Sequence, residues 1–218
     1  DMTPQAARMD AHSLRRIGPS RLCYSGHVLY TRARSPLESR SPLQVGVELF
    51  GESGLAADIE VINLLVETLR QARVESIHLD LGHVGIYRGL EAGAGLDAAE
   101  RAELFDALQR KAAGLRAWLT DHVADVDIAA MLASLPELAG DLDVLARARR
   151  TLAKAPVGVD VALAELSAVA VAVQAANPDI EIYLDLGELR GYHYHTGIVF
   201  AAYSAANPVA MGNGGRYD

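Results

Sequence analysis

Short segments in which apolar and polar residues alternate mark the strands of this chain. The first two are residues 21–30 and 43–51, and the loop that joins them is polar, arginine-bearing and broken by two Ser-Pro steps. In the second segment Gln44, Gly46 and Glu48 take one face, and the apolar residues take the other. The pattern predicts an antiparallel pair of strands around a long loop.

Four more strands are expected in the rest of the chain. Residues 76–81 and 180–186 alternate in the same way. Residues 195–203 and 208–213 flank a turn-rich stretch, which predicts an antiparallel hairpin. The sheet therefore resumes in the last quarter of the sequence.

Apolar residues at helical spacing predict helices between these strands. An amphipathic helix is expected over residues 58–73, where it covers one face of the sheet. Residues 98–175 are rich in alanine and leucine and predict a helical insertion. Breaks within the insertion are expected at Gly114, Pro136, Gly140 and the turn over 156–158. Strands, helices and strands in this order imply an α+β fold built on an antiparallel sheet.

Length and composition predict one composite domain. With 218 residues, half of them hydrophobic, the chain can bury a substantial core. We divide it into a first core part over residues 1–94, a helical insertion over 95–176 and a second core part over 177–218. The abrupt start at Asp1 and end at Asp218 suggest a piece of a longer protein.

Charge and cysteine content exclude several classes of function. The formal net charge of -8 argues against a nucleic-acid surface, because such surfaces need clustered Lys and Arg. We interpret the cluster of Arg147, Arg149 and Arg150 as a solvated helix face. The single Cys23 cannot form an intramolecular disulfide, no secretory leader opens the chain, and no uninterrupted apolar run approaches a membrane span. A cytoplasmic protein with neither tRNA nor a membrane as partner is expected.

The densest group of polar and aromatic residues is the segment Glu188–Gly197, ELRGYHYHTG. Strand-like alternation would place His193 and His195 on one side and Tyr192 and Tyr194 on the other. A His-x-His pair permits a metal site, but no third ligand stands at a suitable interval, so no metal is expected. The alternative is a pocket wall lined by rings, or hydrogen-bonded core histidines.

Two further motifs have both a functional and a structural interpretation. Gln44 and Glu48 are in phase on one strand, where they would clasp an ammonium or imidazole group or would simply face solvent. The terminal NGGRYD, residues 213–218, would cradle a phosphate through backbone amides or form a tight turn, and the turn is favoured. The sequence contains no phosphate-binding P-loop and no nucleophile elbow, so common catalytic templates are absent.

Five segments together resemble one known family. They are DMTPQAARMDAH, LQVGVELFG, HLDLGHVGIYRGL, LRGYHYHTGIVFAAY and GGRYD. They are similar to the regulatory subunits of ATP phosphoribosyltransferase, which are paralogues of histidyl-tRNA synthetase. The resemblance runs nearly end to end and implies a class II aminoacyl-tRNA synthetase-like antiparallel sheet, flanked by helices and carrying a helical insertion.

The resemblance implies a histidine pocket and a degenerate ATP site. In the pocket an acid, a threonine, a glutamine and a glutamate hold the amino acid, an arginine stands at its carboxylate, and His195 replaces a tyrosine that faces the imidazole. The implied pocket residues are Asp1, Thr3, Gln44, Glu48, Arg190, Tyr194 and His195. In the ATP half, Tyr30 stands where an arginine would hold the α-phosphate, Arg32 where a glutamate would meet adenine, and Glu38 at an arginine position. Adenylate formation would lose its phosphate contacts.

A retained amino-acid half beside a broken ATP half predicts a regulator. By resemblance, we expect a non-catalytic subunit that activates the short form of ATP phosphoribosyltransferase and transmits feedback inhibition by histidine in histidine biosynthesis. The expected partners are the catalytic subunit, L-histidine as an effector and further copies of the chain in a hetero-octamer, with no cofactor. The alternatives are a histidyl-tRNA synthetase-like catalytic domain that activates histidine with ATP, and an interaction scaffold with a vestigial pocket.

Overall fold

The computed structural model describes residues 2–32 and 39–218 in two compact units, Asp1–Val61 and Ile62–Asp218. The predicted roles of Asp1 and Glu38 therefore lie outside the described residues, as does the first of the two Ser-Pro steps. The proposed division at residues 94 and 176 stays a prediction.

The first unit is built on a strand pair, as the alternation predicts. It contains α1 (Thr3–Arg8), a π-helical turn η1 (Met9–Leu14), β1 (Ser20–His27) and β2 (Leu43–Phe50). The two strands are antiparallel over their whole length, with Tyr24 opposite Gly46 and Leu22 opposite Glu48. Residues that alternate in the sequence thus share one face of this ribbon.

Helix α2 (Leu55–Gln71) starts in the first unit and ends in the second. It begins three residues earlier and ends two residues earlier than its apolar spacing predicts. In its second half the side chains of Ile62, Val66 and Leu69 are buried. These are residues of the predicted apolar stripe, so the amphipathic pattern identified the buried face correctly.

The second unit contains a five-stranded sheet in the order β4-β5-β3-β6-β7. The strands are β3 (Ile77–His83), β4 (Ala139–Gly140), β5 (Glu181–Asp185), β6 (Ile198–Ser204) and β7 (Asn207–Gly215). All neighbours pair antiparallel except β3 and β5, which are parallel because a helical segment crosses over between them. The predicted strands are confirmed, and the two-residue β4 was not anticipated.

The segment between β3 and β5 is helical, as its composition predicts. Its elements are α3 (Val84–Gly93), α4 (Ala98–Gln109), α5 (Leu115–His122), α6 (Val126–Ser134), η2 (Leu135–Glu137), α7 (Val144–Thr151) and α8 (Val157–Ala176). The expected breaks are found: Gly114 precedes α5, Pro136 lies in the 3-10 turn, Gly140 lies in β4 and Pro156 precedes α8.

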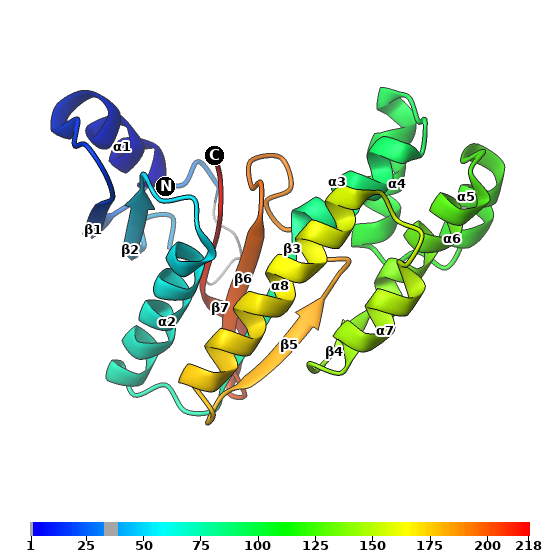
Figure 1. The fold of residues 1–218 in the computed structure, drawn as a ribbon. Helices are drawn as coiled ribbons and strands as arrows, with labels where there is room; N and C mark the ends of the chain where they lie inside the picture. The colour runs from blue at the N-terminus through cyan, green and yellow to red at the C-terminus, as the bar shows by residue number, and fades with distance from the viewer. Residues whose placement is uncertain (1, 33–38) are drawn as a thin grey trace. The chain divides into compact units, whose positions relative to one another are not determined.

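The sheet of the second unit has one apolar and one polar face. Helix α8 packs on β3 and α3 and lies along one face of the sheet (Figure 1). Leu79 and Leu81 of β3 are fully buried, as are Leu166 and Val169 of α8. The other phase of β3 carries His78 and Asp80, beside Tyr183 of β5 and Tyr203 of β6. The second face therefore presents polar groups.

Helix α8 is long and apolar enough, by length and composition, to cross a membrane. The sequence pattern did not predict this, because Asp160 and Glu165 interrupt the apolar residues. One stripe of α8, which includes Leu163, Leu166 and Val173, is buried in the second unit. The helix therefore serves as a core element of this fold, which accounts for much of its apolar character.

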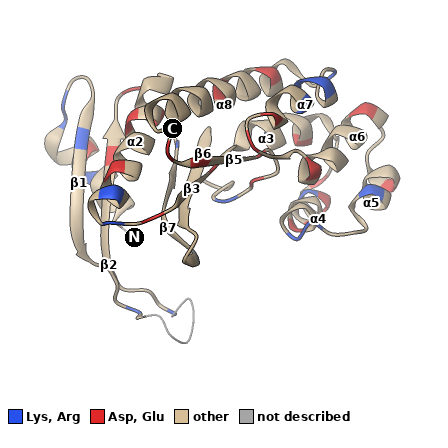
Figure 2. Ribbon diagram, turned by 90° about the horizontal axis from the view of Figure 1, so that it is seen from below, with Lys and Arg blue, Asp and Glu red and all other residues tan. Residues whose placement is uncertain are grey.

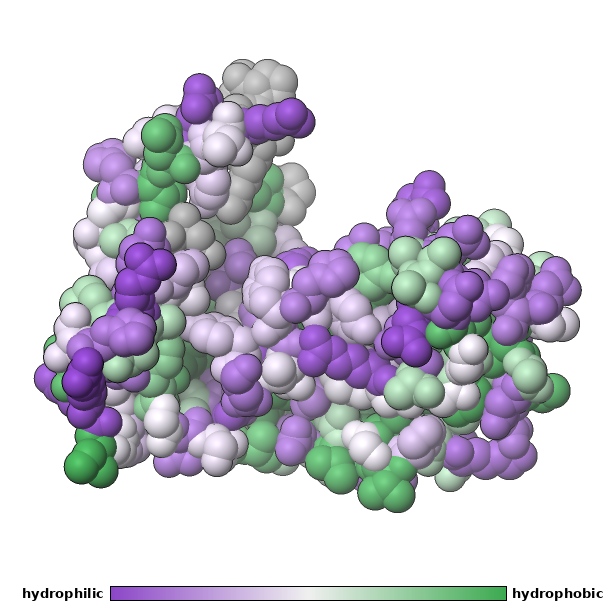
Figure 3. Space-filling view, turned by 90° about the horizontal axis from the view of Figure 1, so that it is seen from above, coloured by the Kyte–Doolittle hydropathy of each residue, from purple (hydrophilic) through white to green (hydrophobic). Residues whose placement is uncertain are grey.

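Charged residues of both signs are interspersed over the helical segment (Figure 2). Arg147, Arg149 and Arg150 are exposed on α7, as predicted. Arg147 donates to the carbonyl of Ala139 at 3.1 Å, and Arg149 donates to the Ser167 hydroxyl at 3.3 Å. Hydrophilic side chains also cover much of the surface in Figure 3. The cluster is thus a solvated helix face that contacts its own unit.

Helix α4 begins with a capping box whose removal has a measurable effect on stability. Asp97 accepts from the backbone N–H groups of Ala99 and Glu100, and Glu100 accepts from the N–H of Asp97. We expect Asp97→Ala to lower the free energy of unfolding by about 1 kcal/mol, because two helix N–H groups lose their acceptor. Chemical denaturation measures this change.

The matched control is Asp121→Ala, which removes an exposed carboxylate from α5. It should change the free energy of unfolding by less than about 0.5 kcal/mol. Equal losses in both variants would show that the cap contributes nothing specific.

Candidate functional site

The side chains of Thr3 and Tyr24 converge on the Glu48 carboxylate of the first unit. The Thr3 hydroxyl donates to Glu48 Oε1 at 2.6 Å, and the Tyr24 hydroxyl lies 3.4 Å from the same oxygen. Glu48 is 9 % exposed, so its charge is held largely away from solvent. Hydroxyl donors around a buried carboxylate keep it in place as an acceptor for a further N–H group.

The contact between Tyr24 and Glu48 depends on a glycine across the strand pair. Tyr24 lies directly opposite Gly46, and its ring crosses β2 at that position. A Cβ on residue 46 would lie 2.4 Å from the ring carbon that carries the hydroxyl, which no side chain tolerates. Sequence reasoning missed Tyr24 as a site residue; an aromatic residue in register with a glycine was the available signal.

Gln44 shares the face of Glu48, as the alternation predicts. Its Oε1 atom is buried and has no hydrogen-bond partner among the described residues. A buried acceptor of this kind is satisfied by a donor from a bound molecule or from water. Gln44 and Glu48 together can accept hydrogen bonds from an ammonium or an imidazole N–H.

The expected nucleotide positions lie beyond the end of β1. Tyr30 pairs through its backbone with Arg40: its N–H donates to the Arg40 carbonyl at 2.8 Å, and Arg40 Nε donates to the Tyr30 carbonyl at 3.0 Å. Arg32 is exposed. The ribbon thus continues to Arg40, and the expected roles of Tyr30 and Arg32 at a degenerate ATP site stay predictions.

The segment Glu188–Thr196, here called the pocket loop, forms turns and not a strand. The N–H groups of Tyr194 and His195 both donate to the Gly191 carbonyl, at 3.0 and 2.8 Å. The predicted alternation is therefore wrong: His193 lies against the ring of Phe105, whereas His195 lies against Tyr194. Among residues 2–32 and 39–218, no group of three or more potential metal ligands occurs.

His195 is the buried histidine of the pocket loop. It is 6 % exposed, and its ring meets Tyr194 at 4.5 Å between centroids. Gly191, at φ +68°, makes room for it, since a Cβ there would lie 2.3 Å from His195 Nδ1. Burial lowers the pKa of His195 below its ordinary value, although the contact with the Arg190 carbonyl opposes this. The ring is therefore neutral near pH 7.

Arg190 contacts the polar face of the sheet. Its guanidinium donates to the Tyr203 hydroxyl at 2.9 Å and forms an ion pair with Glu188 at 3.2 Å. Asp80 of β3 lines a small cavity together with Glu188 and Arg190. Burial raises the pKa of the Asp80 carboxyl, and the charge of Arg190 opposes this shift. Arg190 is thus held by side chains of its own unit.

The terminal NGGRYD segment continues the sheet. Residues 213–215 belong to β7, the Arg216 N–H donates to the Ile198 carbonyl, and the Thr196 N–H donates to the Arg216 carbonyl, both at 2.8 Å. The expected tight turn is wrong, because residues 213–215 belong to β7 and the Arg216 N–H extends the pairing with β6.

The predicted pocket residues fall into both compact units. Thr3, Gln44 and Glu48 belong to the first unit, where Thr3 and Glu48 meet, and Arg190, Tyr194 and His195 belong to the pocket loop of the second. The first group supplies acceptors, and the second supplies rings and a guanidinium. Acceptors such as those of the first group suit an ammonium or an imidazole N–H, and a guanidinium with rings suits a carboxylate or an aromatic group.

A family model and individual relatives both place the chain in the same family of proteins. The family model described as histidyl-tRNA synthetase matches residues 1–218. The chain is 54% identical to an ATP phosphoribosyltransferase regulatory subunit of Teredinibacter turnerae and 52% identical to one of Cellvibrio japonicus, in each case over 100% of its length. It covers 56% and 55% of those proteins, so it spans about half the length of the curated relatives it matches.

Solved structures confirm the predicted fold class. A Bacillus halodurans protein described as an ATP phosphoribosyltransferase regulatory subunit/histidyl-tRNA synthetase superposes with a TM-score of 0.87 at 29% identity, over 100% of this chain and 57% of that one. A chain of the ATP phosphoribosyl transferase (HisG:HisZ) complex of Thermotoga maritima has a TM-score of 0.78 at 16% identity, over 100% and 75% of the two chains. This second likeness concerns the fold alone.

The lowered pKa of His195 predicts a pH-dependent contribution to stability. As the pH falls below about 6.5, the unfolded chain binds a proton that the buried imidazole does not, so the free energy of unfolding decreases. His195→Gln lacks this contribution, and its free energy of unfolding should decrease less on going from about pH 7.5 to about pH 5.5.

Urea unfolding of both proteins across this range measures the difference. Parallel decreases would show that His195 titrates alike in the folded and unfolded chains.

Proposed function

Because this chain belongs to the histidyl-tRNA synthetase family, we propose that it forms part of a regulatory subunit of ATP phosphoribosyltransferase and catalyses no reaction itself. The observation that carries this proposal is identity of 52–54% over the whole chain to regulatory subunits of several bacteria. The Bacillus halodurans structure, whose description includes the same name, supports it.

The acceptors of the first unit favour L-histidine as the effector. Glu48 is buried, fixed by Thr3 and Tyr24, and lies on the same face as the buried Gln44 oxygen. An amino acid with an imidazole offers both a charged ammonium and a ring N–H to such acceptors. In the second unit, Arg190 offers a guanidinium suited to a carboxylate, and Tyr194 and His195 offer rings.

The nucleotide half of the site argues against histidine activation. Tyr30 and Arg32 stand where an arginine and a glutamate are needed, and a phenol cannot replace bidentate phosphate contacts. An enzyme that lacks these groups loses transition-state stabilisation, whereas a sensor needs only to bind its ligand. This difference favours regulation over catalysis.

The proposed partner is the catalytic subunit of short-form ATP phosphoribosyltransferase, in a cytoplasmic hetero-oligomer. Histidine would act by binding one state of the complex more tightly than the other. The resulting coupling free energy is typically about 1 to 3 kcal/mol, enough to change catalytic output several-fold.

Reconstitution with the short catalytic subunit tests the proposal directly. Addition of this protein should raise the rate of ATP phosphoribosyltransferase, and L-histidine should lower it again. A catalytic subunit whose rate is unaffected by a stoichiometric amount of this protein would overturn the proposal.

Replacement of the central acceptor tests the effector site. Glu48→Gln keeps the shape but removes the charge, so the dissociation constant for L-histidine should rise about tenfold or more. Isothermal titration calorimetry measures it. The matched control is Glu75→Gln, an exposed glutamate that should leave the dissociation constant unchanged. Equal affinity in Glu48→Gln would place the effector elsewhere.

Histidine activation remains the competing function, because the matching family model is that of a synthetase. Histidine-dependent exchange of pyrophosphate into ATP separates the two. We expect no exchange above background. Robust exchange would favour the synthetase-like alternative.

A further inference from the structure

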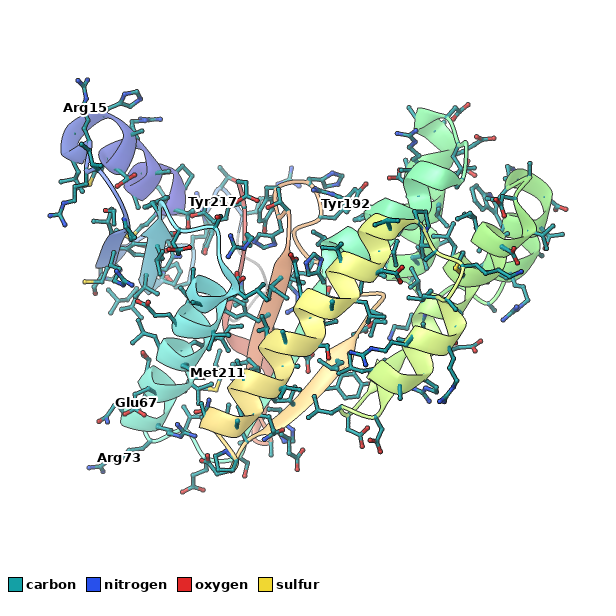
Figure 4. The ribbon with its side chains drawn as sticks, viewed as in Figure 1. Arg15, Glu67, Arg73, Tyr192, Met211 and Tyr217 are labelled. Carbon is teal, nitrogen blue, oxygen red and sulfur yellow. The ribbon has the colours of Figure 1, made fainter. Side chains whose placement is uncertain are left out.

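The ring of Tyr192 fastens the pocket loop to two helices of the second unit. It meets Tyr87 of α3 edge-on at 5.1 Å between centroids and Phe105 of α4 at 5.3 Å. Tyr87 is 1 % exposed, so this contact reaches into the core. Figure 4 shows Tyr192 between the loop that joins β5 to β6 and helix α4. Aromatic pairs in this geometry stabilise a packed arrangement beyond the area they bury.

Two polar residues of α3, Arg88 and Glu91, also contact Tyr192. The Tyr192 hydroxyl donates to Glu91 Oε2 at 3.1 Å, and Arg88 donates to the Tyr192 carbonyl while its guanidinium lies 5.0 Å from the ring centroid. Glu91 in turn faces Arg101 of α4 at 3.5 Å. Burial and the Glu91 carboxylate raise the pKa of Tyr192, so the phenol stays a donor.

The pocket side of the loop follows directly after this anchor. Both Tyr194 and His195 donate their N–H groups to the carbonyl of Gly191, the residue before Tyr192. Gly191 is held at φ +68° with the His195 ring against it. A displacement of Tyr192 therefore moves the two proposed ligand-facing residues with it, because one short turn contains them all.

Helix α5 carries a natural reporter, Trp118, which contacts helix α4. The Trp118 indole N–H donates to Glu103 of α4 at 3.1 Å, and its ring stacks on His122 at 4.2 Å. Trp118 is the single tryptophan of the chain. Its fluorescence thus reports on the contact between α5 and α4.

We propose that Tyr192 is a positioning residue that couples occupancy of the pocket loop to the position of helix α4. A ligand that reorders Tyr194 and His195 then shifts the first helix after α3, and a shift of that helix changes the affinity of the loop. The identity of the ligand, L-histidine, rests on the function proposed above. The mechanical link between loop and helix does not.

Hydrogen exchange of the ligand-free protein tests the link alone. Tyr192→Ala should raise exchange about tenfold both in residues 191–196 and in residues 98–109, because each segment loses its shared contact. Tyr192→Phe keeps the ring and should restore most of the protection of α4. The control Tyr183→Ala removes an exposed tyrosine of β5 and should change neither segment. Faster exchange confined to residues 191–196 would overturn the proposal.

A substitution on the helix tests reciprocity and covers the case in which Tyr192→Ala does not fold. Phe105→Leu removes the ring that meets Tyr192 and His193 from the side of α4. Coupling is reciprocal, so this change should speed exchange in residues 191–196 by about fivefold or more. An unchanged loop in a folded Phe105→Leu protein would refute the link.

Histidine titration then distinguishes this proposal from the proposed effector role. In the wild type L-histidine should change Trp118 fluorescence, whereas folded Tyr192→Ala should bind histidine about tenfold more weakly and give no fluorescence change. Histidine binding without any response of Trp118 or of exchange in α4 overturns the coupling. Absence of histidine binding to the wild type refutes the effector role, and the ligand-free exchange experiments then decide the link.

Discussion

The imidazole of His83 stands at the point where β3 ends and α3 begins, and the pocket loop depends on this junction. Its Nδ1 accepts from the Gly85 N–H at 3.0 Å, so the ring caps the first turn of α3. Because Nδ1 is an acceptor, Nε2 carries the proton and donates to Glu165 of α8 at 3.0 Å. One side chain thus fixes the start of α3 against α8. Helix α3 supplies Tyr87, Arg88 and Glu91, the residues that hold Tyr192.

The central strand β3 connects this junction to the neighbouring strands and to both faces of the sheet. Hydrogen bonds join β3 to β5 on one side and to β6 on the other. Its apolar phase is covered by α8, and its polar phase carries Asp80 beside the ion pair of Arg190 and Glu188. The two strands that flank β3 are the ones joined by the pocket loop. The loop is consequently anchored at both ends in the sheet and at its middle by Tyr192, which explains how a segment made of turns holds His195 at 6 % exposure.

The sequence predicted the regular elements well and the chemistry of the loop poorly, for physical reasons. Alternation locates β3 and β5 because burial of one phase selects apolar side chains, and the turn-rich stretch after residue 203 locates the hairpin of β6 and β7. The same reasoning fails at residues 192–195. There the backbone forms turns with hydrogen bonds to the Gly191 carbonyl, and local composition does not distinguish such turns from a strand. Only the glycine at position 191, which favours a positive φ, marks the turn in the sequence. The contact of Tyr192 with α3 and α4 spans about a hundred residues of sequence, so no local pattern reveals it.

A fold that binds an amino acid becomes a regulator when binding is connected to a movable element. Catalysis demands groups aimed at the charge of a transition state, and we propose that such groups are missing at Tyr30 and Arg32. Regulation demands something different: a ligand shifts an equilibrium only by its differential affinity for the two states. A sensor therefore needs a ligand contact and a link from that contact to another element. The pocket loop combines the two within five residues, since His195 is proposed to face the ligand and Tyr192 contacts the helices. A buried, fixed acceptor such as Glu48 serves a sensor as well as an enzyme, because binding alone requires no groups aimed at a transition state.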